Sequence, residues 1–326
     1  ARAGAIGDTL ANLFSYAGMA PEKEYYINDA GQQVKDLALS LEIRIRQALG
    51  EDIELPEQCY PGDYVKDMAR EYLDEHGSSV LSLPQDERLQ ALADWGVSRI
   101  VARQREELRR YGVEFDVWFS ERSLHESGEV QRAVEILKER GHTYEADGAL
   151  WFRSTAFGDD KDRVLIKSDG HYTYITPDAA YHLNKFRRGF EKVIDIWGPD
   201  HHGYIPRMKA VVQAFGYPAD ALEVLIVQLV RLVRGGQAVR MSKRGGTIIL
   251  MDELLDEVGK DAARFFFLTR APASQLELFG AGAAAPSATS CSHTTRAAES
   301  LPWAAKARAR PARASASRGA RSAAAR

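Results

Sequence analysis

Hydrophobic and polar positions along residues 1–279 follow two distinct periods. Segments with apolar residues at helical spacing alternate with short runs of β-branched and aromatic residues. The spacing predicts helices over residues 7–18, 32–49, 64–76, 84–111, 127–140 and 252–259, and a further helix from 261. It predicts strands over 24–27, 116–119, 164–166, 172–175, 193–197 and 247–250. Strands separated by helices indicate an α/β fold with a largely parallel sheet.

Two of these segments carry more specific expectations. In the first helix, one face is made by Leu10, Leu13, Phe14 and Ala17, and we expect this face to pack against the core. The run 222–233 is apolar and β-branched, so its pattern fits either a strand or a buried helix.

Three segments of the chain are predicted to differ from the α/β pattern. Residues from about 57 to 148 are predicted to form a mostly helical insertion, and residues 251–279 to begin a helical stem. Residues 280–326 are rich in Ala and Arg, and their large apolar side chains are few (Leu301 and Trp303). Such a segment cannot build a core, so we expect a disordered tail. Sequence read out of frame and a basic arm that binds nucleic acid are the other interpretations.

Composition narrows the class of protein. The 326 residues are 45% hydrophobic and 27% charged, as in globular domains. Cys59 and Cys291 are too few and too far apart for a disulfide framework or a zinc ribbon, which fits a reducing compartment. No apolar run reaches the roughly 18 residues of a membrane span, so we expect no membrane partner. The net charge of −3 gives no general electrostatic sign of nucleic-acid binding.

Two loops carry candidate chemistry. Residues 239–246 form a short glycine-rich loop with Lys243 among arginines, which suits a polyphosphate but also fits a basic surface turn. Asp200, His201 and His202 follow the apolar strand 193–197, at the sheet edge where ligands of α/β domains gather. Nucleotide binding, a metal site as in a phosphoesterase, and a plain polar loop all fit this second loop.

Two helix starts bear acidic side chains. Asp178 lies in the first turn of a helix with Thr176 as a candidate cap, and a carboxylate there is favoured by the helix dipole alone. Asn28 and Asp29 follow the strand 24–27, where turn chemistry explains them. From these residues by themselves, no ligand is assigned to either start.

Six segments together resemble one family. In order along the chain they are GAIGD (4–8), EYYINDAG (24–31), DVWFSE (116–121), TYITPDAAYH (173–182), GPDHHGY (198–204) and MSKR (241–244). Their order and spacing are similar to those of arginyl-tRNA synthetases, and the resemblance covers residues 1 to about 278. It implies a Rossmann-type parallel-sheet nucleotide-binding catalytic domain over residues 1–250.

The resemblance also implies a reaction. Arginine and ATP would form arginyl-adenylate and pyrophosphate, with Mg²⁺ accompanying the ATP, and the arginyl group would then move to the arginine tRNA. Members of this family are usually monomeric, and we expect a cytoplasmic protein. No resident metal is implied.

Roles follow for the matching residues. Lys243 would stabilise charge on the departing pyrophosphate, with Met241 and Ser242 beside the ATP. The resemblance assigns Asp178 to a forked pair with the substrate guanidinium, and Tyr174 to orient or stack on it. Contacts to ATP are assigned to Asp200, His201 and His202.

Two departures from the family pattern bear on activity. The family's His-x-Gly-His motif is expected just before Ala1, and a helical anticodon-binding domain after about residue 278; neither is in the sequence. We therefore expect no detectable adenylate formation from these 326 residues. A non-catalytic fragment of the same fold that binds tRNA or a partner is the alternative, and a metal-dependent phosphoesterase is a third hypothesis.

Overall fold

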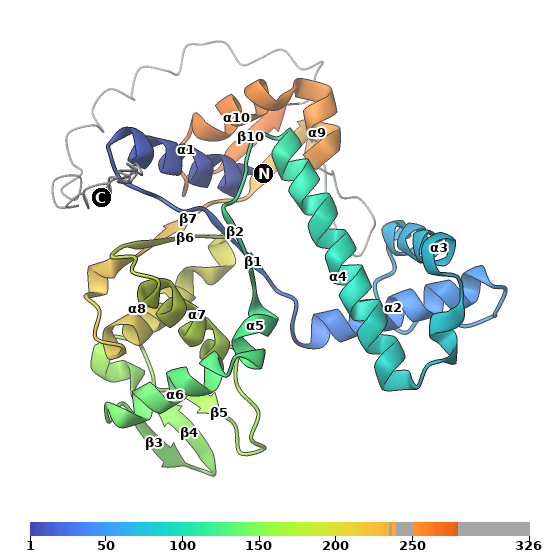
Figure 1. The fold of residues 1–326 in the computed structure, drawn as a ribbon. Coiled ribbons are helices and arrows are strands. Elements are labelled where there is room, and N and C mark those ends of the chain that lie inside the picture. The colour runs from blue at the N-terminus through green and yellow to red at the C-terminus, as the bar shows by residue number, and fades with distance from the viewer. Residues whose placement is uncertain (235–236, 239–250, 280–326) are drawn as a thin grey trace, which may run out of the picture.

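The computed structural model describes residues 1–234, 237–238 and 251–279 (Figure 1). Its α-helices are α1 (Arg2–Tyr16), α2 (Gln32–Ala48), α3 (Asp63–His76), α4 (Gln85–Arg110), α5 (Glu121–Glu126), α6 (Glu129–Glu139), α7 (Ile175–Arg187), α8 (Ile205–Ala214), α9 (Met251–Val258) and α10 (Lys260–Leu268). Its strands are β1 (Glu24–Ile27), β2 (Val117–Ser120), β3 (Thr143–Ala146), β4 (Ala149–Phe152), β5 (Arg163–Ile166), β6 (Val193–Trp197), β7 (Leu222–Ile226), β8 (Val230–Arg234), β9 (Gln237–Ala238) and β10 (Leu276–Phe279). Among these residues, no helix has the length and apolar composition needed to cross a membrane.

Two parallel strand pairs lie beside one central helix. β1 pairs with β2, and β6 pairs with β7, both in parallel. The rings of Tyr26 on β1 and Phe119 on β2 lie 4.6 and 4.7 Å from the ring of Tyr181 on α7. Val193 and Leu222, which begin β6 and β7, are buried in the same core as α7. The parallel pairs and their flanking helices confirm the α/β prediction.

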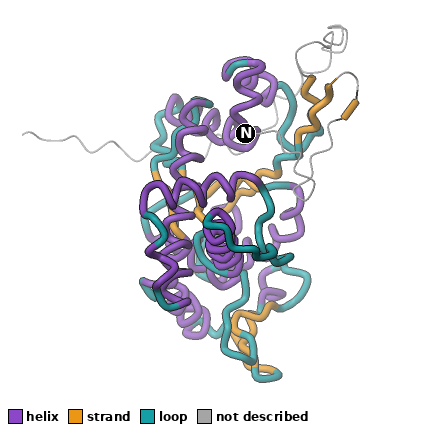
Figure 2. The backbone as a smooth tube through the Cα atoms, turned by 90° about the vertical axis from the view of Figure 1, so that its right-hand side faces the viewer, coloured by secondary structure: helices purple, strands orange, loops and turns teal. Residues whose placement is uncertain are grey.

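Residues 222–233 resolve into two strands. β7 ends at Ile226, and β8 begins at Val230 and pairs in parallel with β10. In the link between them, the main-chain N–H of Val227 donates to Trp197 and that of Gln228 donates to Pro272. The predicted stem, residues 251–279, contains the helices α9 and α10 and then the strand β10. Figures 1 and 2 place this β8–β9–β10 sheet at the opposite end of the molecule from the antiparallel β3–β4–β5 sheet.

The helices α2, α3 and α4 form a lobe with cores of its own. Leu41, Val65, Met68 and Leu92 are fully buried there. α4 runs from this lobe to α9 (Figure 1), where Arg110 pairs with two aspartates of α9. The rest of the predicted insertion lies elsewhere, because β2 pairs with β1 and α6 packs on α7. The division into domains stays a prediction.

Two expectations about individual elements are wrong. No strand spans 172–175: Tyr172 makes one isolated bridge to Ile166, and α7 begins at Ile175. The hydroxyl of Thr173 donates to the Val164 carbonyl, so side-chain hydrogen bonding takes the place of a ladder. Thr176 does not cap α7 either, since its hydroxyl donates to the carbonyl of Leu165.

The buried face of α1 also differs from the predicted one. Leu13 is 58% exposed, and the buried residues are Arg2, Ala5, Ile6, Asp8 and Ala11. Small side chains bring this face against β6, where a Cβ at Gly7 would lie only 3.0 Å from Ile196 Cδ1. Close backbone approach and buried ion pairs therefore decide the orientation of α1.

Candidate functional site

A half-buried carboxylate marks the first turn of α7. The hydroxyl of Tyr204 donates a 2.7 Å hydrogen bond to Oδ2 of Asp178. Burial raises the pKa of Asp178, although this hydrogen bond and the positive charge of His182 act in the opposite direction. The protein therefore does not fully offset the cost of burying an ionised Asp178, and the positive charge of a cationic ligand would reduce that cost.

A second carboxylate, Glu121, lies near Asp178 at the end of β2. Burial raises the pKa of Glu121, and the negative charges of Asp178 and Asp29 raise it further, against a hydrogen bond from Tyr26. Neighbouring carboxylates that disfavour each other's ionisation form a site suited to a cation. Sequence reasoning missed Glu121 as a site residue. The available signal was an acidic residue at the carboxyl end of a predicted strand.

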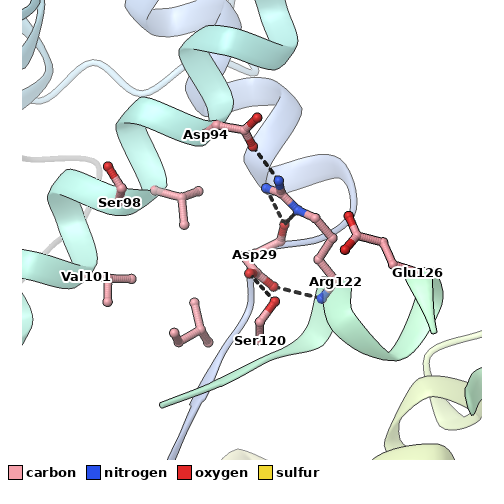
Figure 3. Close-up of a pocket in the computed structure, with 9 residues that line it drawn as sticks. Asp29, Asp94, Ser98, Val101, Ser120, Arg122 and Glu126 are labelled. Carbon is pink, nitrogen blue, oxygen red and sulfur yellow. Dashed lines mark hydrogen bonds and ion pairs between the residues drawn. The ribbon is translucent and has the colours of Figure 1, made fainter.

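Asp29 holds Ser120 and Arg122 (Figure 3), which are the sequence neighbours of Glu121. Its carboxylate accepts a 2.5 Å hydrogen bond from the Ser120 hydroxyl and a 2.9 Å hydrogen bond from the Arg122 main-chain N–H. The Arg122 guanidinium in turn bonds the Asp29 carbonyl and Asp94 of α4. Asp29 therefore orients Glu121, which is a more specific role than the turn chemistry expected from sequence.

A cavity of about 410 Å³ adjoins Asp29, Ser120 and Arg122, between α4 and the ends of β1 and β2 (Figure 3). It is lined by Ile27, Asp29, Asp94, Val97, Ser98, Val101, Ser120, Arg122 and Glu126. Its principal polar groups already bond one another, so we assign the cavity no ligand.

Tyr174 stands immediately before α7 with 90% of its surface exposed. Positions four residues apart share one helix face, and Tyr174 precedes Asp178 by four residues. An exposed ring on the same face can lie over a bound planar cation. Its contact with a ligand stays a prediction.

The loop after β6 is the short helix η3 (Pro199–Tyr204), in which Asp200, His201 and His202 are all exposed. The His201 ring lies 6.1 Å from that of Trp197, which lies 5.9 Å from the ring of Tyr204. Because Tyr204 bonds Asp178, the structure brings this loop and the first turn of α7 together.

The predicted phosphate loop is not among the described residues. Met241, Ser242, Lys243 and the neighbouring Arg240 lie outside the described residues, as do the predicted strand 247–250 and the tail 280–326. Within the part of the chain that the structure describes, no group of three or more His, Cys, Asp or Glu side chains could hold a metal ion.

Parallel strand pairs with flanking helices and a polar loop at the carboxyl end of β6 are typical of the class of nucleotide-binding α/β domains. The family model "tRNA synthetases class I (R), catalytic domain" matches residues 1–267. The chain belongs to this family of class I tRNA synthetases, in which R is the letter for arginine.

Relatives of known sequence agree with this assignment. The chain is 51% identical over 277 residues to an arginine–tRNA ligase of Shouchella clausii, covering 85% of this chain and 50% of that protein. It is 52% identical to an arginine–tRNA ligase of Geobacillus kaustophilus, with the same coverage. The chain thus spans about half the length of the curated relatives it matches.

Solved structures share the fold. One from Campylobacter jejuni, described as a provisionally assigned arginyl-tRNA synthetase, superposes with a TM-score of 0.79 at 38% identity and covers 85% of this chain and 60% of that one. The arginyl-tRNA synthetase of Thermus thermophilus gives a TM-score of 0.63 at 21% identity, over 85% of this chain and 56% of that one, and supports the fold alone.

Proposed function

We propose that this chain is the part of an arginine–tRNA ligase that binds arginine and ATP, with Asp178 and Glu121 as the recognition site for the arginine guanidinium. The observation that supports this most is the pair of half-buried carboxylates whose pKa values are both raised by burial. A guanidinium presents five N–H donors in a planar fork and is more weakly hydrated than an ammonium. It can therefore bond carboxylates on two sides at a low desolvation cost.

The remaining contacts to arginine come from the face above Asp178. Tyr174 covers the guanidinium plane, and Tyr204 keeps Oδ2 of Asp178 turned toward α8, which leaves Oδ1 for the ligand. Asp29 holds Glu121 on the opposite side through Ser120 and Arg122.

ATP is bound beside this pocket. Asp200, His201 and His202 contact the nucleotide from η3, and Met241, Ser242 and Lys243 contact its phosphates, with Mg²⁺ entering as part of MgATP. In the activation step an arginine carboxylate oxygen forms a bond to the α-phosphorus, and the bond to pyrophosphate breaks. Lys243 stabilises the negative charge that pyrophosphate carries away.

The partners of this reaction are arginine, ATP and the arginine tRNA, which receives the arginyl group in the second step. We place the protein in the cytoplasm as a monomer. The family match over residues 1–267 favours this proposal over a phosphoesterase built around His201 and His202.

Isothermal titration calorimetry with L-arginine and L-citrulline tests the guanidinium site. Citrulline has the same shape as arginine without the positive charge. We expect the affinity for citrulline to be at least about tenfold lower, because hydrogen bonds between charged groups are stronger than those to a neutral partner. Asp178→Asn should abolish arginine binding. Asp169→Asn, the same change on an exposed carboxylate, should leave it intact. Equal affinities for the two ligands would contradict the proposal.

A further inference from the structure

A buried ionic network joins α7 to β6 directly behind the proposed arginine site. His182, Lys185 and Asp195 are 3%, 8% and 8% exposed. Nε2 of His182 lies 2.7 Å from Oδ2 of Asp195, and Nζ of Lys185 lies 2.9 Å from Oδ1. Nδ1 of His182 lies 2.7 Å from the main-chain oxygen of Asp178. The imidazole therefore bridges Asp195 and the backbone of Asp178.

Both neighbours of His182 accept hydrogen bonds and cannot donate them. A main-chain carbonyl is always an acceptor, and Asp195 is ionised. Burial acts to raise the pKa of Asp195, but the positive charges of Lys185 and His182 outweigh it and hold that pKa well below its usual range. Two short contacts to acceptors require a proton on each ring nitrogen. His182 is therefore an imidazolium in the folded protein.

This network carries a net positive charge toward Asp178. Lys185 and His182 contribute two cations, and Asp195 neutralises one of them. The positive charges of His182 and Lys185 favour the ionised form of Asp178, and the negative charge of Asp195 opposes it. Asp178 is thus held at two points, at its main chain by His182 and at its side chain by Tyr204.

We propose that His182 is a positioning residue for arginine recognition: its imidazolium, fixed by Asp195, holds the backbone of Asp178 so that the carboxylate faces the ligand. This inference rests on the proposed function, because it assumes that Asp178 binds the guanidinium. His182 acts through Asp178 and makes no contact with the substrate itself.

Nitrogen-15 NMR of the histidine side chains tests the protonation state. Both ring nitrogens of His182 should show directly bonded hydrogens near neutral pH. His171 provides the reference, since it is exposed and contacts a single carboxylate, Asp169. The His182→Gln variant assigns the signals by their loss. A single protonated nitrogen on His182 would overturn the inference, whatever the arginine affinity proves to be.

Arginine affinity tests the positioning role. His182→Ala removes both contacts and should weaken arginine binding about tenfold, whereas His182→Gln keeps one donor and should recover part of the loss. Lys185→Met removes a cation that favours the ionised form of Asp178 but leaves the contact to the Asp178 carbonyl, so its loss of affinity should be smaller than that of His182→Ala. Parent-like affinity in His182→Ala, or an equal loss in Lys185→Met, would contradict the inference.

The two proposals fail separately. Parent-like arginine binding by Asp178→Asn would overturn the proposed function. Loss of binding in Asp178→Asn together with full binding in His182→Ala would overturn the role of His182 alone. Should His182→Ala not fold, as judged by circular dichroism, His182→Gln and the NMR measurement decide the question.

Discussion

Tyr204 and Asp178 join two parts of the chain that carry different predicted tasks. The phenol of Tyr204 ends η3, the loop that bears the nucleotide-binding candidates, and its hydroxyl lies 2.7 Å from Oδ2 of Asp178 in the first turn of α7. Arg207 stacks on the Tyr204 ring with its guanidinium carbon 4.4 Å from the centroid, which steadies the phenol from the other side. The proposed arginine and nucleotide subsites thus share one contact.

Removing this hydroxyl should weaken arginine binding. Tyr204→Phe leaves the ring in place but frees Oδ2 of Asp178, and a hydrogen bond to a charged group contributes roughly 1.5 kcal/mol, or about tenfold in affinity. Calorimetric titration with L-arginine measures the change. Tyr144→Phe removes a hydroxyl bonded to Asp162 in a distant hairpin and serves as the control. Unchanged affinity in Tyr204→Phe would show that the contact does not orient Asp178.

The raised pKa of Asp178 predicts a cost in stability at neutral pH. Because burial raises the folded-state pKa, ionised Asp178 disfavours folding, and stability falls as pH rises from about 3.9 through the folded-state pKa. Asp178→Asn should therefore have a higher free energy of unfolding than the parent at pH 7, with the difference vanishing near about pH 3. Urea denaturation at both pH values measures this. A destabilised Asp178→Asn at pH 7 would contradict the assignment.

Asp195 should behave in the opposite way. Its pKa is lowered by Lys185 and His182 against the effect of burial, so its contribution is present above about pH 3.9 and is lost as pH falls through the folded-state value. Asp195→Asn leaves two buried cations without a counter-charge, which should lower the free energy of unfolding by about 3–5 kcal/mol. Asp63→Asn, which breaks an exposed pair with Lys66, should leave the free energy of unfolding nearly unchanged. Similar losses in both variants would refute this account.

Arg2 should stabilise the segment that follows α10. This buried guanidinium donates to five main-chain carbonyls, those of Gln228, Phe267, Arg270, Ala271 and Ser274. Arg2→Met would remove all five of these hydrogen bonds and should lower the free energy of unfolding by about 2–4 kcal/mol. Hydrogen exchange should rise first in residues 267–274. Arg70→Met, on an exposed pair with Asp67, is the control. Slow exchange in that segment of Arg2→Met would count against this role.

Periodicity predicted long elements well and orientations poorly. α4 was predicted within one residue at each end, because helical spacing of apolar residues persists over many turns. The buried face of α1 was predicted wrongly, since it depends on Gly7 approaching Ile196 and on the ion pairs of Asp8 with Lys23 and Arg264. Such tertiary contacts leave no periodic signal.

The site shows the same limit. Local rules explain Asp178 by the helix dipole alone, and a ligand could be assigned to it only through the family resemblance. Glu121 and His182 were missed because their significance lies in neighbours distant in sequence. One local signal did exist: Asp195 interrupts the buried strand β6, and a buried carboxylate requires a cationic partner.

A crystal structure of this chain soaked with L-arginine tests the central claim most directly. The account predicts the guanidinium between Asp178 and Glu121, with N–H donors within about 3 Å of both carboxylates. Arginine bound instead in the cavity beside Asp94, or bound with its guanidinium in solvent, would contradict it.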